Sequence, residues 1–445
     1  MNHTVDRPSV DPAAQGCASH LRACLTRADA HAAEADVALL VRRDDAALAD
    51  AVAWDTLQRG AVSAPLAGRV LTVKACFDSA GWITHAGSRV LAGAAPAGTD
   101  APLLAALRRL GAVLIAQTNM TEFAYGALGV NSHFGTPTTP LDTRGERVAG
   151  GSSSGAAVAV ALGIADISLG SDTSGSARIP AAFCGVAGFK PSRGRYPDAG
   201  MRYLSTTFDV PGILATSAAA CRQVDGALTG RVESPHAAAS LRDLCFIVPE
   251  RFASDGVDGE VCRAFDDWVC RLSALGARIV CKPLACLAEA GAVARAGGII
   301  AAEAFILHRA TLEAGRELYD PRVGPRIAAG AQVLAHDYVA ALARLQTLAA
   351  QYHAELGEAH AVLTPTVPML PPTIRELDNE DAYLATNARS FRLTEFANRL
   401  DLPSISLPGD LHKRRPVGLL MTGRRGDDAR LLDAAARIEA CLSMT

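Results

Sequence analysis

The segments GGSSSG at residues 150–155 and GSDTSGSARIP at residues 170–180 stand out from the rest of this sequence. Between them, the apolar run 156–162 predicts a helix and residues 164–169 predict a strand, so each segment lies at the boundary of an element. Glycine–serine loops in such places expose backbone N–H groups that can hold an anion. The order loop, helix, strand, loop favours an α/β layered fold with a polar site at the two loops.

The same alternation continues outward from these loops. Residues 19–59 predict one or two amphipathic helices, and the apolar run 69–75 predicts a buried strand that carries Lys74. A helix from Thr99, as its N-cap, to Leu110 and a strand at 112–116 follow. Further strands are predicted at residues 244–248, 278–282, 361–364, 404–407 and 418–422, and further helices at 259–275, 300–318, 336–356 and 427–441. Because there is no linker or internal repeat, we predict one large domain.

The composition is that of a globular protein. The chain has 445 residues, of which 49% are hydrophobic and 20% charged, and its net charge is -3. The interspersed charges exclude the basic face that a nucleic-acid partner requires. Eleven cysteines occur singly rather than in C-x-x-C pairs, which is typical of buried thiols in a reducing compartment.

The N-terminal residues 1–18 are polar and predict a flexible tail, without the apolar core of a signal peptide. No apolar run approaches the length of a membrane span on inspection of the sequence. We therefore expect a cytoplasmic protein with no membrane partner.

The two glycine–serine loops admit several chemical interpretations. A phosphate cradle would need the lysine and spacing of a P-loop or a G-x-G-x-x-G pattern, and neither is present. A nucleophile elbow, as in an α/β-hydrolase-like esterase, matches G-x-S-x-G with Ser153 as nucleophile. That elbow needs a preceding strand and a histidine, but residues 142–149 are polar. The later histidines, His336, His353 and His360, lie in contexts that do not resemble a triad.

A serine–serine–lysine relay is the third interpretation. A serine hydroxyl needs a base to become nucleophilic, and a lysine is a base only when it is neutral. Its reference pKa of about 10.4 must fall by roughly three units, about 4–5 kcal/mol, for it to be neutral near pH 7. Burial is one available cause, and Lys74 lies in an otherwise apolar predicted strand. The alternative role for Lys74 is a salt bridge to Asp78.

These segments resemble the amidase signature family, and the resemblance covers nearly the whole chain. Ser152 matches the family's bridging serine, Ser176 its nucleophile and Lys74 its lysine base. The resemblance extends to residues 118–125, 181–185, 188–191 and 416–421. It implies a single large α/β domain over residues 19–445 with a central mixed β-sheet flanked by helices. Within it, residues 65–220 would form the catalytic core and residues 230–400, with the loop 195–210, the variable pocket.

The resemblance implies a hydrolase of amide C–N bonds that acts on a small-molecule amide through an acyl-enzyme on Ser176, with no cofactor or metal. It also implies a cis peptide bond at the bridging serine. The backbone N–H groups of 173–176 would form an oxyanion hole, contributed by Thr173, Ser174, Gly175 and Ser176. Substrate contacts are expected from Met120, Tyr125, Gly150, Gly151 and Arg178, with Asp172 in a supporting role.

The sequence departs from the family pattern at two positions. Ser174 replaces the first glycine of the usual Gly-Gly-Ser, and Thr121 stands where an aspartate is common. An amidotransferase A-type subunit, delivering ammonia within a complex, is an alternative function from the same family. Such subunits carry a tyrosine-rich segment where this chain has the plainer residues 319–338, which favours a free-standing hydrolase. A homodimer is the oligomeric state that we expect.

Overall fold

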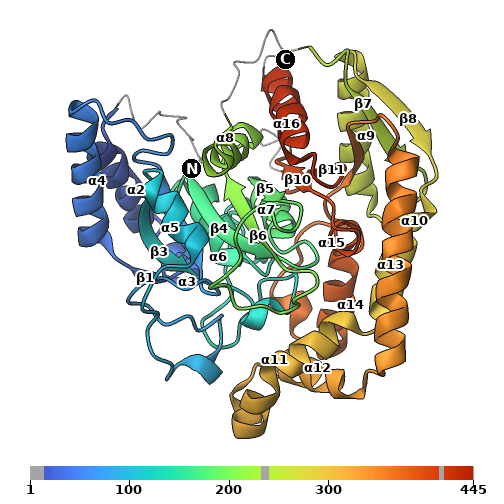
Figure 1. The fold of residues 1–445 in the computed structure, drawn as a ribbon, viewed down its shortest axis with the longest axis horizontal. Helices are drawn as coiled ribbons and strands as arrows, with labels where there is room; N and C mark the ends of the chain where they lie inside the picture. The colour runs from blue at the N-terminus through green and yellow to red at the C-terminus, as the bar shows by residue number, and fades with distance from the viewer. Residues whose placement is uncertain (1–14, 232–239, 410–414, 444–445) are drawn as a thin grey trace.

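One mixed β-sheet runs through the middle of the protein (Figure 1). The computed structural model describes residues 15–231, 240–409 and 415–443. Within these ranges eleven strands pair in the order β1-β3-β2-β4-β6-β5-β10-β11-β9-β7-β8. The strands are β1 Leu39–Arg42, β2 Val70–Lys74, β3 Val113–Thr118, β4 Ile167–Asp172, β5 Ala187–Lys190, β6 Val210–Ala215, β7 Cys245–Pro249, β8 Arg278–Lys282, β9 Ala361–Pro365, β10 Ser404–Leu407 and β11 Leu419–Thr422.

Strand direction explains why the centre of the sheet is so apolar. β2 pairs in parallel with β3 and β4, and all residues of these three strands are buried. Parallel strands have both faces covered, so they lack the apolar–polar alternation of a half-exposed strand. β7 forms a second parallel group with β8 and β9, and antiparallel strands join the two groups. The predicted α/β fold with a central mixed sheet is confirmed.

Helices cover both faces of this sheet. On one face α5, α8, α9 and α16 share an apolar cluster with β2, β4 and β7. On the other face α2, α6 and α7 share a second apolar cluster with β2 and β3. In the second half of the chain, α10, α13 and α15 pack on β7, β9 and β11. The helices are α2 Cys17–Ala30, α3 Ala32–Ala38, α4 Asp44–Arg59, α5 Pro102–Arg109, α6 Ser154–Ala161, α7 Arg178–Cys184, α8 Ala218–Thr229, α9 Gly259–Ala274, α10 Ala285–Ala296, α11 Ile299–Gly315, α12 Gly324–Ala328, α13 Ala335–Leu356, α14 Glu380–Ser390, α15 Glu395–Arg399 and α16 Asp428–Ser443.

Several predicted boundaries are wrong. Residues 1–14 of the predicted tail lie outside the described residues, but Cys17 and Ala18 begin α2 and are buried, because the apolar side of this helix already starts there. Thr99 is not an N-cap, since α5 begins at Pro102 after Ala101. β4 begins three positions later than predicted, and its C-terminal end therefore reaches into the second glycine–serine loop.

One stretch does have the length and composition of a membrane span, contrary to the sequence-based expectation. Residues 285–318 contain an 18-residue window of mean hydropathy 1.5, of which 39% is buried. The stretch is two helices, α10 and α11, separated at Gly297 and Gly298. The helix α10 packs against α13 and α15, so the apolar side chains of α10 contribute to the packing of this domain.

Candidate active site

The Lys74 amine lies between two serine hydroxyls, that of Ser152 in the loop before α6 and that of Ser171 in β4. Lys74 is the last residue of β2, and its Nζ atom lies 2.7 Å from Ser152 Oγ and 2.8 Å from Ser171 Oγ. The side chain is completely buried. Asp78 instead accepts a hydrogen bond of 2.6 Å from Thr84, so the alternative of a Lys74–Asp78 salt bridge is wrong.

Burial changes the acid–base chemistry of this lysine. Desolvation lowers the pKa of Lys74, against the opposing charges of Cys76, Asp209 and Asp172. A buried ammonium group is disfavoured because it loses its hydration, so the neutral amine is populated at lower pH than in water. The lysine therefore combines the geometry and the protonation behaviour of a base for Ser152.

The loop before α6 brings the two glycine–serine segments together. The peptide bond between Gly151 and Ser152 is cis, as the resemblance implies. The backbone N–H of Ser153 donates to the carbonyl of Ser176 at 3.1 Å, which ties the bridging-serine loop to the second loop. The hydroxyl of Ser153 donates to the carbonyl of Ser171 at 3.3 Å rather than to a histidine. The nucleophile-elbow interpretation therefore has no base at Ser153 among the described residues.

Asp172 shapes the loop that carries Ser176. Its carboxylate accepts hydrogen bonds from the backbone N–H groups of Gly175 at 2.8 Å and Ala177 at 3.0 Å. It also binds the guanidinium of Arg178 through both oxygens. Burial alone would raise the pKa of Asp172, but the charge and hydrogen bonds of Arg178 outweigh it and hold that pKa well below its usual range. Asp172 thus remains an anion that fixes the loop.

Gly175 is not available as the oxyanion-hole donor that the sequence predicts. The N–H of Gly175 is already bound to Asp172, so it is occupied rather than free for a substrate oxygen. Gly175 has φ +136°, and a Cβ at this position would collide with Thr394, so the loop requires glycine here. Thr173, Ser174 and Ser176 line the adjacent cavity and are the remaining candidates.

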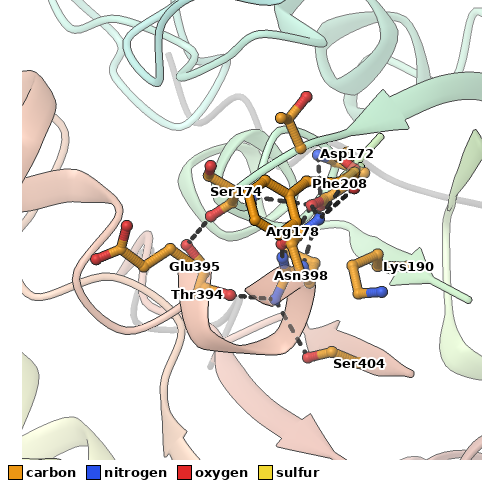
Figure 2. A network of polar contacts seen from close by, with 12 residues as sticks. Asp172, Ser174, Arg178, Lys190, Phe208, Thr394, Glu395, Asn398 and Ser404 are labelled. Carbon is orange, nitrogen blue, oxygen red and sulfur yellow. Dashed lines mark hydrogen bonds and ion pairs between the residues drawn. The ribbon is translucent and has the colours of Figure 1, made fainter. Parts of the chain in front are cut away.

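Residues from a much later part of the chain contact the loop that carries Ser176, and Figure 2 shows Thr394 and Asn398 among them. We call Thr394, Asn398 and Arg399 the C-terminal clamp. Thr394 donates to the carbonyl of Ser174 at 2.6 Å, and Asn398 donates to the carbonyl of Asp172 at 3.0 Å. Arg399 donates to the carbonyl of Thr173 at 3.1 Å. Each carbonyl of residues 172–174 therefore has a partner from the clamp.

Arg178 belongs to this support structure rather than to the substrate pocket. It is completely buried, and besides Asp172 its guanidinium donates to the carbonyl of Thr394 at 3.0 Å and to Asn398 Oδ1 at 2.7 Å. Lys190 lies close by. Its burial, and to a smaller extent the charge of Arg178, lowers the pKa of Lys190 to about 8. The expected substrate contact by Arg178 is therefore not supported, because all of its donors face protein groups.

A cavity of about 640 Å³ opens beside the second loop. Of the expected substrate contacts, Tyr125 lines it, whereas Met120, Gly150 and Gly151 are buried and do not. Most of its wall comes from later segments, including α10, α14 and α15. Its apolar lining includes Leu204, Phe252, Leu287, Ile300 and Phe391. Within the described part of the chain, no group of three or more His, Cys, Asp and Glu side chains is arranged to hold a metal ion.

Sequence reasoning missed the second contact of Lys74 and the whole C-terminal clamp. Ser171 carried a usable signal, because it lies in the GSDTSGSARIP segment next to the strand that leads into it. The clamp carried none. Thr394 lies 220 positions after the residue that it binds, and only the folded chain brings them together.

Comparisons with known proteins identify the family of this chain. The family model described as Amidase matches residues 19–432. The chain is 34% identical to 2-amino-5-chloromuconic acid deaminase of Comamonas testosteroni over 88% of this chain and 86% of that protein. It is 33% identical to the A-type subunit of glutamyl-tRNA(Gln) amidotransferase from Aromatoleum aromaticum, over 89% of this chain and 88% of that one.

A solved structure described as a crystal structure of amidase superposes with a TM-score of 0.85 and 32% identity, covering 96% of both chains. The chain therefore belongs to the amidase family and is a hydrolase of amide C–N bonds.

Proposed function

We propose that this protein hydrolyses the C–N bond of a small carboxylic amide through an acyl-enzyme on Ser176. The observation that carries the proposal is the contact of 2.7 Å between Ser152 Oγ and the Nζ atom of the buried Lys74. A serine beside a neutral lysine can accept a proton and pass it on. The backbone N–H of Ser153, the residue after Ser152, donates a hydrogen bond to the carbonyl of Ser176, which links the two serine loops.

The proposed first step forms the acyl-enzyme. Ser176 Oγ attacks the amide carbonyl carbon and gives its proton to Ser152 Oγ, while Ser152 gives its own proton to Lys74 Nζ. When the tetrahedral intermediate collapses, the C–N bond breaks and Ser152 protonates the leaving nitrogen, with Lys74 returning a proton to Ser152. Water then attacks the acyl group along the same relay, which releases the carboxylic acid and regenerates Ser176.

Backbone donors stabilise the charge that develops on the carbonyl oxygen. We assign this role to N–H groups of Thr173, Ser174 and Ser176, without the occupied N–H of Gly175. Removing one such donor costs about 2.7–4 kcal/mol in known cases. Asp172 and the C-terminal clamp support these donors by fixing the backbone of the loop before substrate arrives.

Two matched serine variants test the proposal. Wild type, Ser176→Ala and Ser153→Ala are incubated with a panel of primary and aryl amides, and released ammonia or amine is measured. We expect Ser176→Ala to lose activity and Ser153→Ala to retain most of it. Loss in Ser153→Ala with activity retained in Ser176→Ala would instead support the esterase-type use of Ser153.

The amidotransferase-type alternative makes a different prediction for the isolated chain. It is favoured by the similarity to the A-type component of glutamyl-tRNA(Gln) amidotransferase. We propose the free-standing hydrolase, which turns over amides without a second protein, and a homodimer is the assembly that we expect. Activity that appears only when a second protein is added would favour the alternative. We also propose a cytoplasmic location, because the cysteines of the described residues form no disulfide bond with one another.

A further inference from the structure

The cavity beside Ser176 has an unusual balance of charge. Five arginines and one acidic side chain line it: Arg295, Arg326, Arg389, Arg392, Arg399 and Glu395. A small-molecule site is ordinarily apolar with a few placed polar groups, so such an excess of one sign carries information about the ligand.

Three of these arginines are paired with protein carboxylates, two of them with the same one. Glu395 pairs with both Arg295 and Arg399, and Arg389 pairs with Asp258 at 2.6 Å. Because Glu395 is already held by two guanidinium groups, it is not available to bind a substrate ammonium. These pairs explain the positions of three cations without any ligand.

Arg326 and Arg392 have no carboxylate within ion-pair distance among the described residues. Arg326 donates to the carbonyl of Tyr125 at 2.7 Å and stacks over its ring at 3.9 Å. Arg392 donates to the carbonyl of Phe252 at 2.9 Å and lies 5.3 Å from the centre of that ring. The Nη1 atom of Arg392 is buried with no hydrogen-bond partner.

A guanidinium group placed in this way is costly unless an anion joins it. A buried donor without a partner loses its hydration with nothing in return, and the cost is larger for a charged group. Burial lowers the pKa of Arg392 from its ordinary value, and the charge of Asp255 opposes this shift without cancelling it. The planar fork of arginine matches a carboxylate better than any neutral amide or alkyl group.

We propose that Arg392, assisted by the positive charge of Arg326, binds a carboxylate group of the substrate. The substrate class is then an amide that carries a carboxylate remote from its scissile bond, such as the monoamide of a dicarboxylic acid. The apolar lining residues Leu204, Phe252 and Phe391 would contact the carbon chain between the two ends. This inference rests on the proposed amide hydrolysis and names the substrate of that same site.

Matched substrates separate the carboxylate from the rest of the molecule. The monoamides of the linear C4, C6 and C8 dicarboxylic acids are compared with the primary amides of the monocarboxylic acids of equal length, by ammonia release. For the best chain length, we expect kcat/KM of wild type to be at least about tenfold higher for the charged substrate. Equal values within each pair would overturn the proposal while leaving amide hydrolysis intact.

The variants are Arg392→Gln and, as a matched control, Arg389→Gln. Both remove one positive charge from the cavity wall, but only Arg389 already has a protein counter-ion. We expect Arg392→Gln to lower kcat/KM for the charged substrate by about 10–100-fold through KM, and for the neutral one by less than about threefold. An equal loss on both substrates, or an equal effect of Arg389→Gln, would overturn the assignment.

A binding measurement does not depend on turnover. The melting temperature of the Ser176→Ala variant is measured with the linear C6 dicarboxylate and with the C6 monocarboxylate. We expect the dicarboxylate to stabilise this variant more than the monocarboxylate does, and the difference to disappear in the Ser176→Ala, Arg392→Gln double variant. No stabilisation would overturn the carboxylate site, whereas stabilisation without hydrolysis by wild type would count against the proposed function alone.

Discussion

Ser174 Oγ accepts a hydrogen bond of 2.8 Å from Nη2 of Arg399. Ser174 is the position at which this chain departs from the glycine of the family pattern, and Arg399 comes from the far end of the sequence. Both side chains are buried. A buried hydroxyl and a buried guanidinium each need a hydrogen-bond partner, and here each group is the partner of the other.

Replacing Ser174 by alanine should destabilise the protein. The variant leaves Nη2 of Arg399 without its short bond, and the remaining contact to Glu395 is longer, at 3.4 Å. We expect a loss of about 1–3 kcal/mol in the free energy of unfolding, measured by urea denaturation. The exposed Ser254 provides the control, since Ser254→Ala should change stability little. Equal stability of both variants would show that Arg399 does not depend on the hydroxyl.

The two serines that contact Lys74 should differ in their effect on rate. Ser152 and Ser171 lie at nearly equal distances from Nζ. Only Ser152 is proposed to transfer a proton, so Ser152→Ala should lower kcat about 10²–10⁴-fold. Ser171→Ala removes a positioning contact, and we expect a loss of about tenfold. Ammonia release under saturating substrate measures both, and equal losses would contradict the assigned relay.

The rate should rise with pH. The proposed relay needs the neutral form of Lys74, and burial lowers the pKa of this lysine, so kcat/KM for a neutral amide should increase as the pH rises through that lowered pKa. The rising part of this pH profile, which we call the Lys74 limb, should level off at a pH below the ordinary lysine pKa of about 10.4. A rate that does not change between about pH 5 and 9 would contradict a lysine base.

A second group near Lys74 can be separated from it in the same profile. Burial raises the pKa of Asp209 to about 6, and Lys74 opposes that shift. The variant Asp209→Asn removes this titration and one negative charge. We expect the Lys74 limb to move to lower pH in this variant, because the carboxylate favours the ammonium form. A limb that disappears would assign the titration to Asp209 instead.

Asp172 should be indispensable for stability. The variant Asp172→Asn leaves the completely buried Arg178 without a counter-ion, and breaking a buried pair costs about 3–5 kcal/mol. The control is Asp29→Asn, which breaks the exposed pair with Arg42 and should cost less than about 1 kcal/mol. Thermal and urea unfolding of the two variants measures the difference, and similar stability in both would contradict the role of Asp172.

Much of the fold follows from the sequence because its central strands are continuous apolar runs. The strands around Lys74 and at 404–407 lie where the pattern predicts them. The pattern does not predict β5 and β6, because glycine and proline interrupt them and both residues lower strand propensity. It does not predict β1 either, because the four residues of this strand lie inside a stretch with helical spacing.

The site was predictable only in part, for a related reason. Lys74, Ser152 and Ser176 lie in or beside local motifs with a chemical meaning of their own. Arg392 lies in the turn between α14 and α15, and Arg399 is the last residue of α15. Their place in the cavity depends on how these two helices pack against distant elements. Such packing has no local pattern in one sequence. The charge of the cavity was therefore visible only in the folded chain.

The position of the C-terminal clamp has a consequence for protein synthesis. A nascent chain that has left the ribosome up to residue 220 already contains both glycine–serine loops and Lys74, but not the residues that hold the carbonyls of 172–174. An unfinished chain therefore carries the reactive groups without their final arrangement. We therefore expect amide cleavage to become available only when translation has passed Arg399, and a prematurely terminated product to be inert.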